Sequence, residues 1–134
     1  MYRVVLDTNV IISATISNGK PRQLLKNEVK DKKYVLVTSN KILNEIRDVL
    51  CRPKFQMSED NIDQILFALV SSSDIKIVKS NFKVVKEDPE DDMIINTAYD
   101  GQADYIVSGD DDLLRMKKFK NIKMVTVADM LKLL

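Results

Sequence analysis

Residues 2–9 have the sequence YRVVLDTN, and this stretch decides the fold. Tyr2–Leu6 is a short run rich in β-branched residues, which is typical of a strand buried on both faces. The polar segment Asp7–Asn9 ends the strand and offers N-caps for a helix over 10–16. The stretch is therefore predicted to be the first strand–helix unit of an α/β protein.

The rest of the chain continues this alternation without a linker or repeat, which predicts one α/β domain over 1–134 around a mainly parallel sheet. Further strands are predicted at 34–37, 105–107 and 122–125, with short extended stretches at 75–78 and 84–85. Helices are predicted to begin near Pro21, Asn40, Ser58, Asp88, Asp110 and Thr126, and Gly101 is the expected C-cap of the fourth of these.

Composition excludes several kinds of active site. The 134 residues include no His, which excludes a Ser-His-Asp triad, a Cys-His pair and His-ligated zinc. Cys51 is the single Cys, so an internal disulfide and a zinc ribbon are excluded as well. The net charge of +1 indicates no partner. No apolar run suggests a membrane span or signal peptide, and we expect a cytoplasmic protein.

Acidic residues follow the predicted strands at positions that favour a common site. Asp7 ends the first strand, and Asp110 comes just after the strand at 105–107. Glu45 lies early in the helix after the second strand, about 100° from the centre of its apolar face on an ideal helix. Asp92 lies in the first turn of the helix opened by Pro89. Since ligands bind beyond the carboxyl ends of parallel strands, we expect these four carboxylates at one rim of the sheet.

Four neighbouring carboxylates repel each other, and their pKa values rise unless a cation compensates. Mg²⁺ or Mn²⁺ is the natural compensating ion because it is hard and prefers oxygen ligands. Such an ion polarises a phosphodiester and lowers the pKa of a bound water. The pattern thus points to metal-dependent phosphodiester chemistry.

Each acid also has a purely structural interpretation. Asp7 could be an N-cap, and Glu45 alone could be a solvated helix residue. For Asp88 and Glu90 the favoured interpretation is interaction with a helix dipole, and for Asp111 it is a turn or cap. The joint placement at strand ends, rather than any single residue, favours a site.

Four ordered motifs resemble the PIN domain family over essentially the whole chain, and most closely its branch of toxin components from toxin–antitoxin systems. They are VVLDTNV at 4–10, TSNKILNEI at 38–46, DPEDD at 88–92 and ADYIVSGDDDLL at 103–114. RPKF at 52–55 also resembles that branch. The resemblance implies a three-layer α/β/α sandwich and an endoribonuclease that depends on Mg²⁺ or Mn²⁺.

The resemblance also implies roles for single residues. The family's catalytic, metal-binding acids fall on Asp7, Glu45, Asp92 and Asp110, with Asp112 as a possible assistant to the last. Supporting residues that orient these acids or a bound water fall on Thr8, Asn9 and Ser108. Contacts with RNA are expected from Arg22, Arg52 and Lys54, with Lys20, Arg115, Lys117 and Lys118 as further candidates.

Several alternatives remain open at this level. The same fold could serve as a catalytically silent module that binds RNA or protein, or as an RNA-processing nuclease outside a toxin system. A phosphatase or phosphorylated receiver also has acids at strand ends, but a receiver needs a Lys after its last strand, and here Thr126–Asp129 follows it. The expected partners are an RNA substrate, a cognate antitoxin and a second copy of the chain.

Overall fold

The computed structural model describes residues 1–85 and 88–134. Its centre is a six-stranded sheet with the strand order β3-β2-β1-β4-β6-β5. All neighbouring strands are parallel except β5 and β6, so the predicted, mainly parallel sheet is confirmed. The strands are β1 (Arg3–Leu6), β2 (Val35–Ser39), β3 (Ser73–Lys76), β4 (Tyr105–Val107), β5 (Lys118–Phe119) and β6 (Ile122–Val125).

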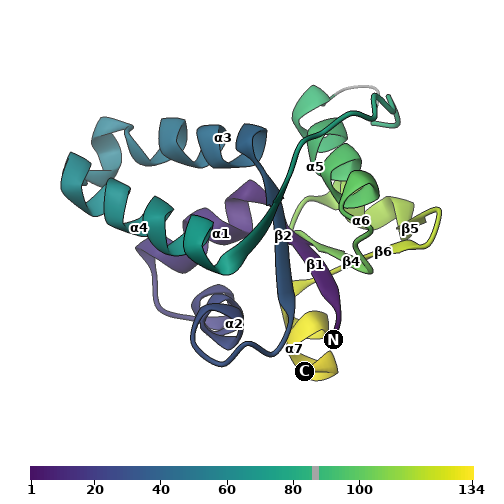
Figure 1. Ribbon diagram of the computed structural model, residues 1–134, viewed down its shortest axis with the longest axis horizontal. Coiled ribbons are helices and arrows are strands. Elements are labelled where there is room, and N and C mark those ends of the chain that lie inside the picture. The colour runs from purple at the N-terminus through teal and green to yellow at the C-terminus, as the bar shows by residue number, and fades with distance from the viewer. Residues whose placement is uncertain (86–87) are drawn as a thin grey trace.

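Helices cover both faces of the sheet and produce the predicted three-layer α/β/α sandwich (Figure 1). Helices α1 to α4 lie on one face, and α5 and α6 lie on the other (Figure 1). The short α7 packs against α2. The helices are α1 (Thr8–Ile16), α2 (Lys20–Val29), α3 (Asn40–Leu50), α4 (Glu59–Ser72), α5 (Pro89–Asp100), α6 (Asp111–Met116) and α7 (Val127–Leu133), with a 3₁₀ turn η1 (Pro53–Phe55).

Local sequence signals account for most of these boundaries. The apolar side chains of β1, Val4, Val5 and Leu6, are almost completely buried, as expected of a strand covered on both faces. The hydroxyls of Ser58 and Thr126 accept hydrogen bonds from backbone amides at the starts of α4 and α7, which confirms both predicted caps. None of the helices among the described residues is long and apolar enough to span a bilayer.

Three local features differ in detail from what the sequence predicts, each for a physical reason. Strand β5 was not predicted, because two residues carry too little alternation to indicate a strand. The predicted extended stretch at Val84 and Val85 does not pair into the sheet, and these residues instead donate their backbone N–H groups to a side chain of α5. Gly101 is the C-cap of α5, as predicted, although its φ of −85° is not left-handed. Glycine is needed there because a Cβ would lie 2.4 Å from a methyl carbon of Val37.

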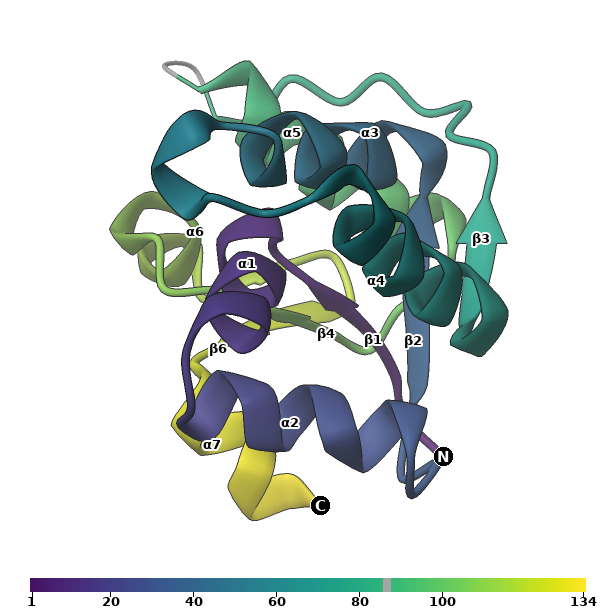
Figure 2. The same cartoon turned by 90° about the vertical axis from the view of Figure 1, so that its left-hand side faces the viewer.

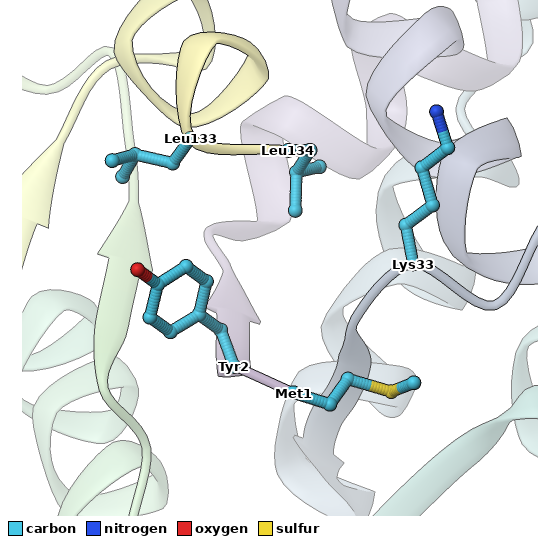
Figure 3. Close-up of a pocket in the computed structure, with 5 residues that line it drawn as sticks. All are labelled: Met1, Tyr2, Lys33, Leu133 and Leu134. Carbon is cyan, nitrogen blue, oxygen red and sulfur yellow. The ribbon is translucent and has the colours of Figure 1, made fainter.

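The edge of the sheet where the parallel strands begin holds an exposed pocket without any acidic side chain (Figure 3). The residues that line it are Met1, Tyr2, Lys33, Leu133 and Leu134. Asp7 follows the other end of β1, roughly 13 Å away for four residues at about 3.3 Å each. The acids predicted to form a site therefore lie at the opposite edge.

Candidate active site

Asp7 is held at the carboxyl edge of the sheet by the neighbouring strand. Its backbone N–H donates to the carbonyl oxygen of Val107 at 2.9 Å, which places it level with the end of β4. The Ser108 hydroxyl donates to Asp7 Oδ2 at 2.7 Å, and the same hydroxyl accepts from the backbone N–H of Asp110 at 2.9 Å. Asp7 occupies the N-cap position of α1, but its side chain makes no capping hydrogen bond. Its carboxylate is thus directed toward Ser108 and Asp110.

Three carboxylates from two helix starts meet beside Asp7. Asp88 is the N-cap of α5, Asp91 lies in the first turn of that helix, and Asp110 is the N-cap of α6. One carboxylate oxygen from each lies within 4.8 Å of the others, an arrangement suited to a metal ion. We call Asp88, Asp91 and Asp110 the carboxylate trio. The trio joins segments that lie about 20 residues apart in the sequence.

Asp91 is the most perturbed acid of the site. It is buried, and burial followed by the negative charges of Asp110 and Asp88 raises its pKa from 3.8 to about 7. For Asp7, burial is also the largest cause of a raised pKa. The Ser108 hydroxyl partly opposes this rise, and the charge of Asp110 adds to it. The acids therefore store like-charge repulsion that a cation would relieve.

Glu45 reaches the same site from α3 on the opposite face of the sheet. Its pKa is raised first by burial and then by the charges of Glu90 and Asp7, which shows that it lies within range of both. The Thr8 hydroxyl acts in the opposite direction and lowers the pKa of Glu45. Thr8 is buried, and among the described residues its hydroxyl has no hydrogen-bond partner at normal distance.

The residues of this site fit a divalent metal ion. Asp91 Oδ2 is buried, and within the described part of the chain it has no hydrogen-bond partner. A buried polar atom without a partner costs about 1–3 kcal/mol, and a charged group costs more. A hard cation bound by Asp91 and the rest of the trio would supply the missing partner. The donor set is entirely carboxylate, which suits Mg²⁺ or Mn²⁺ better than zinc.

Asp92, predicted as the third acid, points elsewhere. Its Oδ1 accepts the backbone N–H groups of Val84 and Val85 at 2.9 and 2.8 Å, and Asp91 takes the place expected for it. The helical pattern contains a signal for this difference. On an ideal helix, Asp91 lies about 15° from the centre of the apolar face of α5, and Asp92 lies about 115° away. The motif DPEDD at 88–92 ends in these two adjacent aspartates, and an Ile stands three residues after each, so the motif could not distinguish them.

Of the other predicted residues near the site, some join the carboxylate trio and some do not. Asp110 belongs to the trio, whereas Asp112 is exposed and its Oδ1 lies 3.3 Å from Arg115 Nη2. Asp110 Oδ1 also accepts the backbone N–H of Asp112 at 2.8 Å. Asp88, for which a helix-dipole role is favoured from sequence, both caps α5 and joins the trio. Asn9 is exposed at the first turn of α1.

The three basic residues predicted to contact RNA differ in how much of their side chain remains available. The Arg22 guanidinium donates to two carbonyl oxygens at the C-terminal end of α1, at 2.9 and 3.0 Å. Its geometry indicates a structural role in joining α1 to α2. Arg52 is exposed before η1, and Lys54 Nζ lies 5.1 Å from the ring centroid of Phe55. Both remain predictions as substrate contacts.

Comparisons with known proteins agree with this geometry. Residues 3–112 match the family model described as "PIN domain". The uncharacterized protein MJ1680 of Methanocaldococcus jannaschii is 37% identical over 119 residues, which cover 86% of this chain and 75% of that protein. A crystal structure of VapBC2 from Rickettsia felis, bound to a DNA fragment from its promoter, has a similar fold with a TM-score of 0.64. The aligned region is 16% identical and covers 92% of this chain and 98% of the other, a likeness that concerns the fold alone.

Proposed function

Because the chain belongs to the PIN domain family, we propose that it is an endoribonuclease that depends on Mg²⁺ or Mn²⁺. The observation that carries the proposal is the buried Asp91 carboxylate, which lies beside Asp88 and Asp110 and has an oxygen without a hydrogen-bond partner among the described residues. We assign the metal ligands to the carboxylate trio and Asp7, with Glu45 on the other side of the site. Asp91 replaces Asp92 in this assignment.

The remaining polar groups of the site act on these acids. Ser108 fixes the direction of the Asp7 carboxylate and, through its contact with the Asp110 amide, the start of α6. Thr8 adds a buried hydroxyl beside Glu45, where it can donate to that carboxylate or to a water. A divalent ion in this site supplies a Lewis acid for a phosphate oxygen and lowers the pKa of a bound water. The carboxylate trio and Asp7 would hold such an ion, with Glu45 beside it.

Two pairs of neighbouring aspartates provide matched tests. In the first, Asp91→Asn is compared with Asp92→Asn by melting each protein with and without Mn²⁺. We expect Mn²⁺ to stabilise the wild-type protein and Asp92→Asn, but not Asp91→Asn. Asn at position 92 keeps an amide oxygen that can accept from the Val84 and Val85 amides, so that variant should fold normally.

The second pair tests cleavage. Asp110→Asn and the adjacent, exposed Asp111→Asn are incubated with single-stranded RNA and Mn²⁺. The first should lose nearly all cleavage, whereas the second should cleave as the wild type does. Equal cleavage by both variants would remove Asp110 from the site. RNA binding without cleavage in the wild-type protein would instead favour a silent binding module.

We also propose that the nuclease is the toxin of a toxin–antitoxin pair. Support comes from the motif resemblance to that branch and from the fold shared with the VapBC2 structure. Expression of the chain alone should slow growth of a host cell, and Asp91→Asn should not. Normal growth with the active enzyme would favour an RNA-processing role. A cytoplasmic location and a homodimer remain predictions, and the latter is checked by light scattering.

A further inference from the structure

One side of α5 holds a neighbouring segment in a defined extended conformation. Residues 79–85 follow β3 and run past α5 and α3 (Figure 2). Three side chains spaced four residues apart on α5, Asp92, Asn96 and Asp100, bind the backbone of this segment. Such a ladder orders a stretch that has no helix or strand of its own.

The ladder is nearly continuous along the segment. Asp100 Oδ2 accepts the backbone N–H groups of Lys79 and Ser80 at 2.6 and 2.9 Å. Asn96 accepts the N–H of Phe82 at 2.8 Å and donates to its carbonyl oxygen at 3.1 Å. Asp92 completes the ladder with the two bonds described above. The backbone of the segment is therefore bound at both ends and in the middle.

Side chains of the held segment alternate as they do in a strand. Lys79, Asn81 and Lys83 are exposed, whereas Phe82 turns inward and packs against the aromatic ring of Tyr99, with ring centroids 4.8 Å apart. Exposed side chains two residues apart repeat at about 6.6 Å. Two members of this exposed row, Asn81 and Lys83, also line a groove beside α5.

The segment forms one wall of a groove that also borders the start of α5. Pro89 and Met93 of α5 and Val85 of the segment provide its apolar surface. Its charged lining consists of Lys41 of α3, Lys83 of the segment and the carboxylate of Asp92, which accepts the Val84 and Val85 amides. Pro89 directly follows Asp88 of the trio, and Lys41 lies four residues before Glu45 on the same face of α3. The groove is therefore adjacent to the acids that we propose to be catalytic.

We propose that this groove binds a nucleotide of single-stranded RNA next to the cleaved bond, with Lys41 and Lys83 contacting its phosphates. The inference rests on the proposed ribonuclease function and adds a substrate subsite to it. An apolar wall with cations beside it matches a base attached to a charged backbone, and Asn81 adds an amide for hydrogen bonds with a base edge. In this arrangement Asp92 is a positioning residue, because it holds the wall of the groove rather than a metal.

The test measures binding of a fluorescently labelled, unstructured RNA oligonucleotide in EDTA, so that cleavage does not contribute. A Lys41→Gln/Lys83→Gln variant should bind roughly tenfold more weakly at 0.1 M salt, and the slope of log K against log salt should fall by about 1.4. The control is Lys30→Gln/Lys33→Gln, which removes the same charge from exposed residues at and just after the end of α2. The control should bind almost as the wild type does.

The outcomes separate the groove from the nuclease assignment. The proposal is supported if the groove variant binds RNA weakly and the Lys30→Gln/Lys33→Gln control does not. Equal weakening in the two variants overturns the proposal, because RNA affinity would then depend on net charge and not on the groove. If the groove variant binds RNA normally while the wild-type enzyme cleaves RNA with Mn²⁺, the groove proposal is wrong and the ribonuclease proposal stands. If the groove variant binds weakly and no protein cleaves RNA, the groove is an RNA-binding site and the ribonuclease proposal is wrong. Thermal melting of each variant in EDTA establishes that it is folded.

Discussion

Replacement of Asp91 by Asn should stabilise the metal-free protein and make its stability less dependent on pH. In the folded chain the pKa of Asp91 is about 7, raised first by burial, whereas in the unfolded chain it returns to about 3.8. Between these values the unfolded chain has released a proton that the folded chain still holds. Rising pH therefore favours unfolding in this window, and the loss is complete above pH 7.

The size of this effect follows from the two pKa values. Their difference corresponds to about 4 kcal/mol at 1.36 kcal/mol per pKa unit. Solvent near the half-buried Asp88 and Asp110 screens the repulsion, and we expect about 2 kcal/mol to remain. For a domain of 134 residues this is a rise of roughly 7 °C in melting temperature.

The assay is urea unfolding of the wild type and Asp91→Asn in EDTA, from pH 4 to pH 8.5. The two proteins should have similar stability at pH 4, and the variant should be about 2 kcal/mol more stable above pH 7. Asp48→Asn, an exposed change on α3, serves as the control and should follow the wild type at every pH. A difference between wild type and Asp91→Asn that stays constant with pH would refute the reasoning. With saturating Mn²⁺ the order should reverse, because only the wild type binds the ion tightly.

Three further predictions concern single contacts. Ser108→Ala leaves a buried oxygen of Asp7 without its donor, and urea unfolding should show a loss of about 1–3 kcal/mol together with weaker Mn²⁺ binding in calorimetry. Gly101→Ala forces a Cβ against Val37, and thermal unfolding should show a loss of about 1–3 kcal/mol; an unchanged melting temperature would contradict the close approach. Arg22→Ala removes guanidinium bonds to the end of α1 and should cost about 1–2 kcal/mol, whereas RNA affinity measured by anisotropy should change little. A large loss of RNA affinity would restore Arg22 as a substrate contact.

Local patterns were sufficient for several strands of the sheet and for two acids of the site. The strands β4 and β6 have the predicted bounds, because β-branched runs between polar turns are local signals. Asp7 directly follows β1, and Asp110 lies three residues after the end of β4. The two strands are parallel, so both end at the same edge of the sheet. Their meeting therefore follows from sequence order together with the rule for parallel sheets.

Other features depend on contacts that no local pattern contains. The packing of Gly101 against Val37 joins residues 64 positions apart, and the sequence offers only a glycine at a helix end. The docking of residues 79–85 on α5 likewise uses side-chain bonds to backbone amides, which leave no periodic signal in the segment. These features required the tertiary structure.

The choice between Asp91 and Asp92 shows the difference between what the sequence determined and what the tertiary structure decided. By itself the sequence determined an α/β domain of the PIN type with acids gathered at one edge of the sheet, because strand order and chain polarity are enough for that. The tertiary structure decided that Asp91, not Asp92, faces the other acids. The physical reason is that neighbouring residues of a helix point about 100° apart, so the rotation of α5 on the sheet selects which carboxylate is buried in the site.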